Sequence, residues 1–284
     1  MFELYIENKN GDRLGFGMNS PFTITEVQGL APSEADIHTS TAANLDGENY
    51  INSKLQARQL NIAFVVDYDA EVNRLAAYKV LKSKQPVTVY YKSAGRDVYI
   101  KGHIRTVDVG HFEMKQPVTV SILCPQPYWL NINAFVEDIS TIINRFHFPF
   151  ASTAANEIVF GEFAQEVNLV VNNDGDSETG LKISVFIKKA MSSFKVFNYI
   201  TKDFIGVNYP FKALDEVIIN TNKGEKDIYL IRNGVTTPLL PYKTKGSTWL
   251  YIDIGENVFT YTTSTNNTAD ALVKVTYNKL YQGV

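Results

Sequence analysis

Apolar and polar residues alternate with a period of two through most of the chain. The clearest example runs from residue 59 to 66, where every second position is apolar. The same alternation marks residues 2–6, 87–91, 98–104 and 118–124. Strands that bury one face and expose the other produce this pattern, as in antiparallel sheets. The sequence therefore predicts a mainly β fold.

One segment, Asp69–Lys82, has the spacing of a helix. Its apolar side chains form a single stripe, made of Val72, Leu75, Ala76, Ala77 and Val80. Asp69 is suited to cap the first turn, and Pro86 prevents the helix from continuing. Because an apolar stripe needs a covering partner, we expect this helix to pack on a sheet with the whole stripe buried.

Prolines at positions 125 and 127 end the first series of strands and indicate a domain boundary. Alternation resumes near Glu166 and continues to Tyr277 in short strands, with Asn233-Gly234 as a strong hairpin turn. Regular short strands without a helix are typical of a β-sandwich. We therefore expect two domains, residues 1–132 and 133–284.

Charge and cysteine content narrow the classes of function. The chain carries 27 basic and 30 acidic residues, a formal net charge of −3, which disfavours a nucleic-acid-binding protein. Its one cysteine, Cys124, cannot form an internal disulfide, and no apolar run approaches the length of a membrane helix. The first residues lack the basic and apolar regions of a signal peptide. We expect a protein made in a cytoplasm, without membrane contact.

The usual enzymatic constellations are missing from the sequence. His103 and His111 could meet across a hairpin as zinc ligands, but a third ligand is not evident. Cys124 continues an apolar strand face, which favours a small buried side chain over a reactive thiol. The run Asn172–Asp176 resembles a calcium loop in composition, yet its glycine is misplaced, which favours a turn. We predict no enzyme activity, no catalytic residue, no metal and no cofactor.

Aromatic residues in the second half offer an alternative function. Trp249, Tyr251 and Tyr261 could stack on sugar rings if they were exposed, and the protein would then be a carbohydrate-binding adhesin. All three lie at alternating strand positions, which is the pattern of a core face. The alternation therefore favours burial of these rings over sugar binding.

Four stretches occur in an order that is seen in a known family. They are Leu45-Asp46-Gly47-Glu48 with the strand at 60–66, the helix with the strand at 86–91, the run Leu123–Trp129, and residues 171–176 with Trp249 and 255–257. Together they resemble the distal tail protein family of long-tailed bacteriophages. The run at 123–129 is similar to the family's Cys-x-Asp-Pro-Tyr, with Gln126 in place of the acidic residue.

The resemblance implies a structural role at the distal end of a virion tail. Six copies would form a ring that joins the tail tube to the baseplate or adsorption apparatus. The first domain would be a tail-tube-like β-sandwich or barrel with one helix, and the second a galectin-like β-sandwich. Implied partners are the tail tube protein and a tail-associated hub protein at the tip, with a receptor-binding protein as a further candidate. DNA would pass through the lumen without specific binding.

The stretch 31–52 is long, polar and rich in small residues, so it buries little of itself within its own domain. Asp46-Gly47 suits a tight hairpin tip, and Tyr50 and Ile51 follow as anchors. A solvated loop is the alternative. With the resemblance, these features predict an inter-subunit interface that comprises Asp46, Gly47, Tyr50, Ile51 and Arg58.

Overall fold

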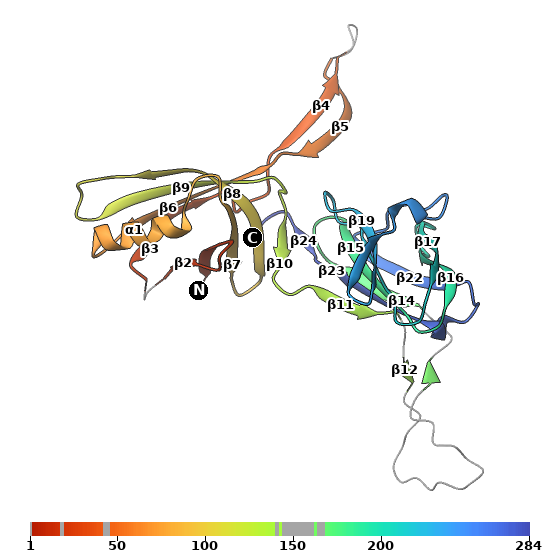
Figure 1. Ribbon diagram of the computed structural model, residues 1–284. Helices are drawn as coiled ribbons and strands as arrows, with labels where there is room; N and C mark the ends of the chain where they lie inside the picture. Colours follow the sequence, from red (N-terminus) through yellow and green to blue (C-terminus); the bar gives the residue numbers. More distant parts are fainter. Residues whose placement is uncertain (1, 18–19, 42–45, 140–141, 144–161, 164–167) are drawn as a thin grey trace, which may run out of the picture. The chain divides into compact units, whose positions relative to one another are not determined.

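The computed structural model describes residues 2–17, 20–41, 46–139, 142–143, 162–163 and 168–284 (Figure 1). Across these residues the protein is mainly β, with α1 (Ala70–Val80) as the one α-helix. The expected mainly β class with a single helix is confirmed. The chain forms two units, Met1–Ile132 with Leu280–Val284, and Asn133–Lys279. Leu280–Val284 therefore belongs with the first unit, although the sequence pattern predicts 133–284 as one domain.

One antiparallel sheet with the strand order β2-β1-β7-β8-β9-β6-β3 forms the first unit. Its strands are β1 (Glu3–Asn8), β2 (Arg13–Phe16), β3 (Phe22–Gln28), β6 (Arg58–Val66), β7 (Pro86–Lys92), β8 (Asp97–Val109) and β9 (Gln116–Cys124). The first half of β8 pairs with β7 and the second half with β9, with a register shift between Ile104 and Thr106. Inward positions of these strands, such as Ile6, Ile62 and Ile100, fill a single core.

Two short strands complete this unit from distant parts of the chain. Strand β10 (Trp129–Asn131) pairs with β8 on one side and with β24 (Leu280–Tyr281) on the other. In that register Trp129 lies opposite Tyr281. The end of the described chain is therefore an integral strand of the first unit.

Strands β4 (Ala35–Ser40) and β5 (Asn49–Leu55) form a two-stranded sheet of their own in the first unit. Figure 1 draws them as a hairpin that leaves the main sheet. Most of their residues are exposed on both faces. Within the stretch that the sequence marks as poorly able to bury itself, the described residues thus pair as two antiparallel strands, with a register shift between His38 and Thr39.

Helix α1 corrects one expectation. Its buried residues are Ala77 and Val80, and buried Leu81 follows them. Val72 and Leu75 of the predicted stripe are 70% and 52% exposed. The prediction of a fully buried stripe is wrong, because the face of α1 turned to the core runs from Ala70 through Ala77 to Val80, and Val72 and Leu75 lie on another face. None of the helices in the described part of the chain is long and apolar enough to span a membrane.

The second unit contains two facing groups of strands around one core. One sheet has the order β11-β23-β15-β18-β19-β20, with β21 beside β15, and the other has the order β14-β22-β16-β17. Their bounds are β11 (Phe135–Asp138), β14 (Leu169–Asn173), β15 (Thr179–Ile187), β16 (Met191–Asn198), β17 (Phe204–Phe211), β18 (Glu216–Asn220), β19 (Asp227–Arg232), β20 (Val235–Pro238), β21 (Tyr251–Ile252), β22 (Gly255–Thr263) and β23 (Ala271–Tyr277).

Three smaller features complete the second unit. Strands β12 (Ile142–Ile143) and β13 (Glu162–Phe163) pair with each other. Two 3-10 turns occur at Leu240–Tyr242 and Thr268–Asp270. Asn233 and Gly234 both have positive φ between β19 and β20, as a tight hairpin turn requires.

Candidate functional site

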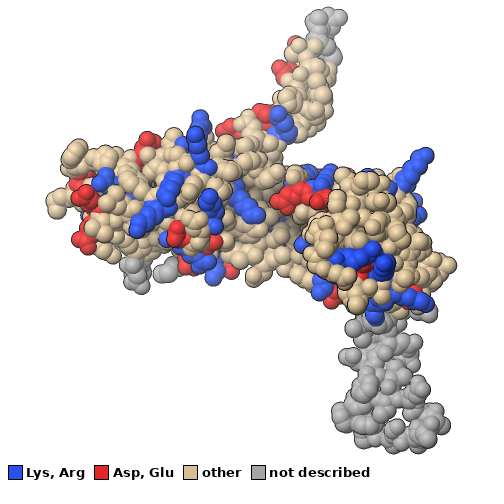
Figure 2. Space-filling view, viewed as in Figure 1, with Lys and Arg blue, Asp and Glu red and all other residues tan. Residues whose placement is uncertain are grey.

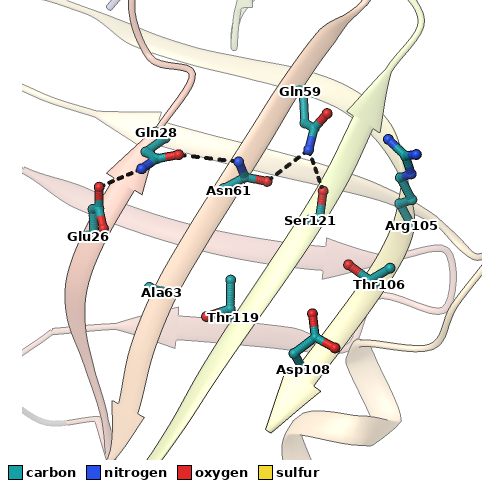
Figure 3. A pocket seen from close by; sticks show the side chains of 10 residues that line it. All are labelled: Glu26, Gln28, Gln59, Asn61, Ala63, Arg105, Thr106, Asp108, Thr119 and Ser121. Atoms are coloured by element: carbon teal, nitrogen blue, oxygen red, sulfur yellow. Dashed lines mark hydrogen bonds between the residues drawn. The ribbon is translucent and has the colours of Figure 1, made fainter.

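A broad polar surface covers the outward side of β3, β6, β9 and the second half of β8 (Figure 3). It arises because period-two alternation sends Leu60, Ile62 and Phe64 into the core and the residues between them outward. The residues that line it are Glu26, Gln28, Gln59, Asn61, Ala63, Arg105, Thr106, Asp108, Thr119 and Ser121. We call these ten residues the polar face.

Side-chain amides connect the strands across the polar face. Asn61 Nδ2 donates a hydrogen bond to Gln28 Oε1 at 3.3 Å, which joins β6 to β3. Gln59 Nε2 donates to Ser121 Oγ at 3.0 Å, which joins β6 to β9. Gln28 Nε2 donates in turn to Glu26 Oε1 at 2.6 Å. Five of the nine polar residues of this surface are therefore engaged with one another, as the dashed lines in Figure 3 show.

The polar face carries little charge. Its charged side chains are two carboxylates, Glu26 and Asp108, and one guanidinium, Arg105. Proteins hold DNA chiefly through Lys and Arg contacts with phosphates, which release counterions. A wide surface of amides and hydroxyls with one cation offers very little of that affinity.

The β4–β5 hairpin holds four of the five residues predicted for an interface. Asp46 and Gly47 are exposed between the strands, and Gly47 has a φ of 88°. Tyr50 and Ile51 on β5 are 65% and 59% exposed. Ile37 on β4, which the sequence analysis did not single out, is 64% exposed. The hairpin thus presents large apolar side chains to solvent.

Arg58, the fifth predicted interface residue, lies in the interior of its own unit. Its residue surface is only 2% exposed, and its guanidinium lies 5.8 Å from the ring centroid of Trp129. Burial lowers the pKa of this guanidinium from its ordinary value. It donates hydrogen bonds to four backbone carbonyls, those of Gly29, Ala31, Pro127 and Gln282. We therefore remove Arg58 from the expected interface and assign it a structural role.

The three aromatic residues of the adhesin alternative do not form a stacking platform. Tyr261 is 3% exposed, its hydroxyl donates to the carbonyls of Thr268 and Ala271, and burial raises its pKa to about 12. Trp249 and Tyr251 are half-buried. The Lys226 ammonium lies 5.6 Å from the Trp249 ring centroid and 5.3 Å from that of Tyr251. This geometry gives no support to sugar binding.

The histidines named as possible zinc ligands have other surroundings. His103 is an exposed residue of β8, and His111 Nδ1 lies 2.9 Å from Arg74 Nη1. Among the residues that are described, no group of three His, Cys, Asp or Glu side chains is placed to hold a metal ion.

Two further motifs have local structural explanations. Cys124 is fully buried, and burial raises the pKa of its thiol to about 12, so the thiol stays protonated at neutral pH. In the run 172–176, Asn173 Oδ1 accepts a hydrogen bond from the Gly175 amide at 3.0 Å. That is an Asx-type turn between β14 and β15.

The sequence pattern predicts an exposed hairpin region, but it does not by itself identify the polar face. The sequence signal for the polar face is the set of polar residues in two alternating segments. These residues are Gln59 and Asn61 in one segment and Thr119 and Ser121 in the other. The register that sets these two strands side by side, with Asn61 opposite Ser121, is visible only in the structure.

Two family models match the chain, one on each unit. The phage tail protein RIFT-related domain matches residues 9–124. The C-terminal domain of the siphovirus-type tail component matches residues 174–281. No curated protein matches the chain by sequence.

Solved structures of phage proteins share the fold. The chain resembles SPP1 Dit, described as a paradigm of the hub adsorption apparatus in phages that infect Gram-positive bacteria. The likeness covers 99% of both chains, with a TM-score of 0.67 and 15% identity. A chain of the phage P2 baseplate, in its activated conformation with Ca, covers 97% of this chain and 98% of its own, with a TM-score of 0.53 and 12% identity.

Proposed function

The chain belongs to the siphovirus distal tail protein family, and from this premise we propose that six copies close into a ring at the distal end of a phage tail. In the ring the first unit joins the tail tube to the adsorption apparatus, and the second unit faces outward. The neighbours are the tail tube protein, a tail-associated hub protein and, on the outward side, a receptor-binding protein. The copies are made in the cytoplasm of the bacterial host.

The observation that carries this proposal is the polar face. A conduit for DNA needs a wall that a polyanion can pass without being held. Two carboxylates and one cation among ten lining residues meet that requirement. The amides of Gln59 and Asn61 are already engaged with neighbouring side chains, which leaves fewer donors for phosphates. We therefore assign the polar face to the lumen of the ring.

The topology of the first unit is compatible with ring closure. Strand β3 ends the strand order on one side of the polar face, and an edge strand is a template for pairing with another chain. Contacts between two different surfaces of one protein are head-to-tail, and they close into rings when the rotation permits. The β4–β5 hairpin supplies a second surface able to reach a neighbour.

Electron microscopy of intact tails tests the ring directly. We expect six copies in one ring at the distal end, and a location elsewhere in the particle would refute the proposal. The lumen assignment is tested by Asn61→Lys with Thr119→Lys, which adds two cations to the polar face. These tails should assemble but release DNA more slowly, because the new cations bind phosphates. The matched control, Ser192→Lys with Thr262→Lys on exposed positions of the second unit, should release DNA normally.

A further inference from the structure

The β4–β5 hairpin has an apolar face without a covering partner. Among the described residues its strands pair only with each other, and their side-chain hydrogen bonds stay between residues 34 and 56. Ile37 and Tyr50 lie on one face, since Tyr50 is opposite Thr39 and Thr39 is two positions from Ile37. Both side chains are more than 60% exposed. Because an isolated two-stranded hairpin is only marginally stable in water, this one needs a surface to lie on.

The hairpin is also acidic. Residues 34–55 contain four carboxylates, Glu34, Asp36, Asp46 and Glu48, and one cation, Lys54. Lys54 Nζ lies 3.6 Å from Asp36 Oδ2, so this lysine neutralises one of the four carboxylates. Within the described part of the chain the other three carboxylates form no ion pair. A partner surface for the hairpin should therefore be basic.

A basic surface lies on the main sheet of the same unit. Residues 79–105 contain seven Lys or Arg side chains and a single carboxylate, Asp97. We define the basic strip as the exposed residues Lys82, Lys84 and Lys101, none of which lines the polar face. Figure 2 shows Lys and Arg side chains gathered on this unit and carboxylates along the hairpin.

Backbone geometry brings the basic strip together. The Lys84 amide donates to the Ile104 carbonyl at 2.9 Å, which sets the loop after α1 beside β8. Lys101 points outward from β8 beside exposed His103, about 7 Å away along the strand, and the Gln85 amide donates to the Lys82 carbonyl at 3.1 Å, which sets Lys82 and Lys84 in one turn. In the described part of the protein no member of the strip forms a salt bridge. Three cations on one side of the unit without ion-pair partners favour an acidic partner.

The same sheet surface offers an apolar contact. Tyr99 lies two positions before Lys101 and therefore points outward with it. Tyr90 lies opposite Tyr99 on β7, with 5.9 Å between ring centroids. Both tyrosines are half-buried, with part of each ring at the surface. Tyrosine combines apolar area with a polar tip, which suits it to interfaces.

We infer that the basic strip of one copy holds the β4–β5 hairpin of a neighbouring copy. The hairpin carboxylates face the strip cations, and the Ile37 and Tyr50 side chains lie on Tyr90 and Tyr99. This inference rests on the proposed ring and names the contact that closes it. Since each copy carries both surfaces, the contact is head-to-tail and can repeat around the ring. Opposite charges fix the register, and like charges reject strip-to-strip or hairpin-to-hairpin pairing.

A charge-swap experiment on the full chain tests the contact. The strip variant is Lys84→Glu with Lys101→Glu, and the hairpin variant is Asp46→Lys with Glu48→Lys. The swap variant carries all four changes, and the control is Lys9→Glu with Lys245→Glu on exposed positions outside both surfaces. Mass photometry measures the fraction of chains in rings, and thermal melting checks that each monomer folds. A DNA-cellulose column measures retention of the strip variant.

We expect the strip and hairpin variants each to lose at least about tenfold of the ring population, and the swap variant to recover it to within about twofold. The control should match the wild type. This inference alone would be overturned if the strip variant and the hairpin variant both kept the wild-type fraction of chains in rings. It would also be overturned if the swap variant formed as few rings as these two variants. A strip variant that forms rings normally but is retained less than the wild type on DNA-cellulose would also overturn it, because the strip would then be a nucleic-acid-binding surface. Wild-type copies that never associate would overturn the ring and this contact together.

Discussion

Arg58 and Gln282 are 224 residues apart in the chain, and the Arg58 guanidinium donates a hydrogen bond to the Gln282 carbonyl. The same guanidinium holds the carbonyls of Gly29 and Ala31, which precede the β4–β5 hairpin. The Val284 amide donates to the Leu30 carbonyl at 3.1 Å beside them. One buried cation therefore fastens both the 280–284 segment and the root of the hairpin to the main sheet.

Arg58→Ala should destabilise the first unit by about 3 kcal/mol or more, because buried carbonyls lose a charged donor. Arg58→Lys should recover only part of this, since lysine lacks the planar fork. Each unit contains one tryptophan, Trp129 or Trp249, so fluorescence-monitored unfolding in a Trp249→Phe background reports on the first unit. Arg13→Ala, which breaks an exposed ion pair, is the control and should cost less than about 1 kcal/mol. Similar costs for Arg58 and Arg13 would contradict the role given to Arg58.

Removal of residues 280–284 should destabilise the first unit and spare the second. The segment supplies β24 and the Tyr281 ring, whose centroid lies 4.3 Å from the Arg96 guanidinium carbon. It also provides the Gln282 and Gly283 carbonyls that Arg58 and Arg96 bind. The denaturation midpoint of the first unit should fall, while Trp249 fluorescence reports an unchanged second unit. The opposite result would assign the segment to the second unit.

Two leucines at the helix should respond differently to truncation. Leu75 is 52% exposed on α1, whereas Leu81, directly after the helix, is 3% exposed. Leu81→Ala should cost about 2 to 5 kcal/mol by leaving a cavity, and Leu75→Ala less than about 1 kcal/mol. Urea denaturation of the two variants gives the comparison. A larger loss for Leu75 would restore the buried stripe that the sequence pattern predicts.

The strands could be predicted because burial and strand geometry share one period. Residues 58–66 and 116–124 alternate between core and surface as β6 and β9, as their sequence pattern indicates. The helix was predictable in place but not in orientation. An apolar stripe shows that one face can be buried, whereas tertiary packing decides which face is turned to the core, and here it is the face of Ala70, Ala77 and Val80.

The parts that the sequence could not predict depend on distant backbone. The return of 280–284 to the first unit is a pairing across about 150 residues, which leaves no local periodicity. The partners of Arg58 are main-chain carbonyls, which every residue carries and no motif marks. The polar face could be predicted only in part. Its polar side chains appear in the alternating pattern, but its width depends on the order of the strands, which the pattern does not contain.

The second unit should lose stability in acid through Asp215. Its burial disfavours the carboxylate, but hydrogen bonds from Arg232, at 2.6 and 2.7 Å, and from the Lys212 amide outweigh this and lower the pKa. A depressed pKa in the folded state gives stability that is complete above the ordinary aspartate value of about 4 and is lost as the pH falls toward the folded value. Trp249-monitored denaturation should therefore show a falling midpoint below about pH 4.

Asp215→Asn tests which carboxylate is responsible. The variant should be less stable at pH 7, because Arg232 loses its buried partner, and its stability should vary less with acid. Asp253→Asn, at an exposed position, should keep the wild-type acid profile. An unchanged acid dependence in Asp215→Asn would exclude this carboxylate as the cause.

Replacement of residues 37–53 by a two-residue turn should separate folding from assembly. The hairpin residues are exposed and pair only among themselves in the described structure, so the monomer should stay within about 0.5 kcal/mol of the wild type. Surface hairpins tolerate shortening because loop closure depends only weakly on length. Ring formation and tail assembly should fail, because each shortened copy lacks the acidic and apolar hairpin surface that binds the basic strip of its neighbour. Ile37→Ala with Tyr50→Ala, which keeps the hairpin and its charges, should show an intermediate assembly defect. Thermal melting beside a tail-assembly complementation assay gives both quantities for each variant. A large loss of monomer stability would mean that the hairpin supports its own unit, and normal tails from the shortened chain would show that it is only a solvated loop.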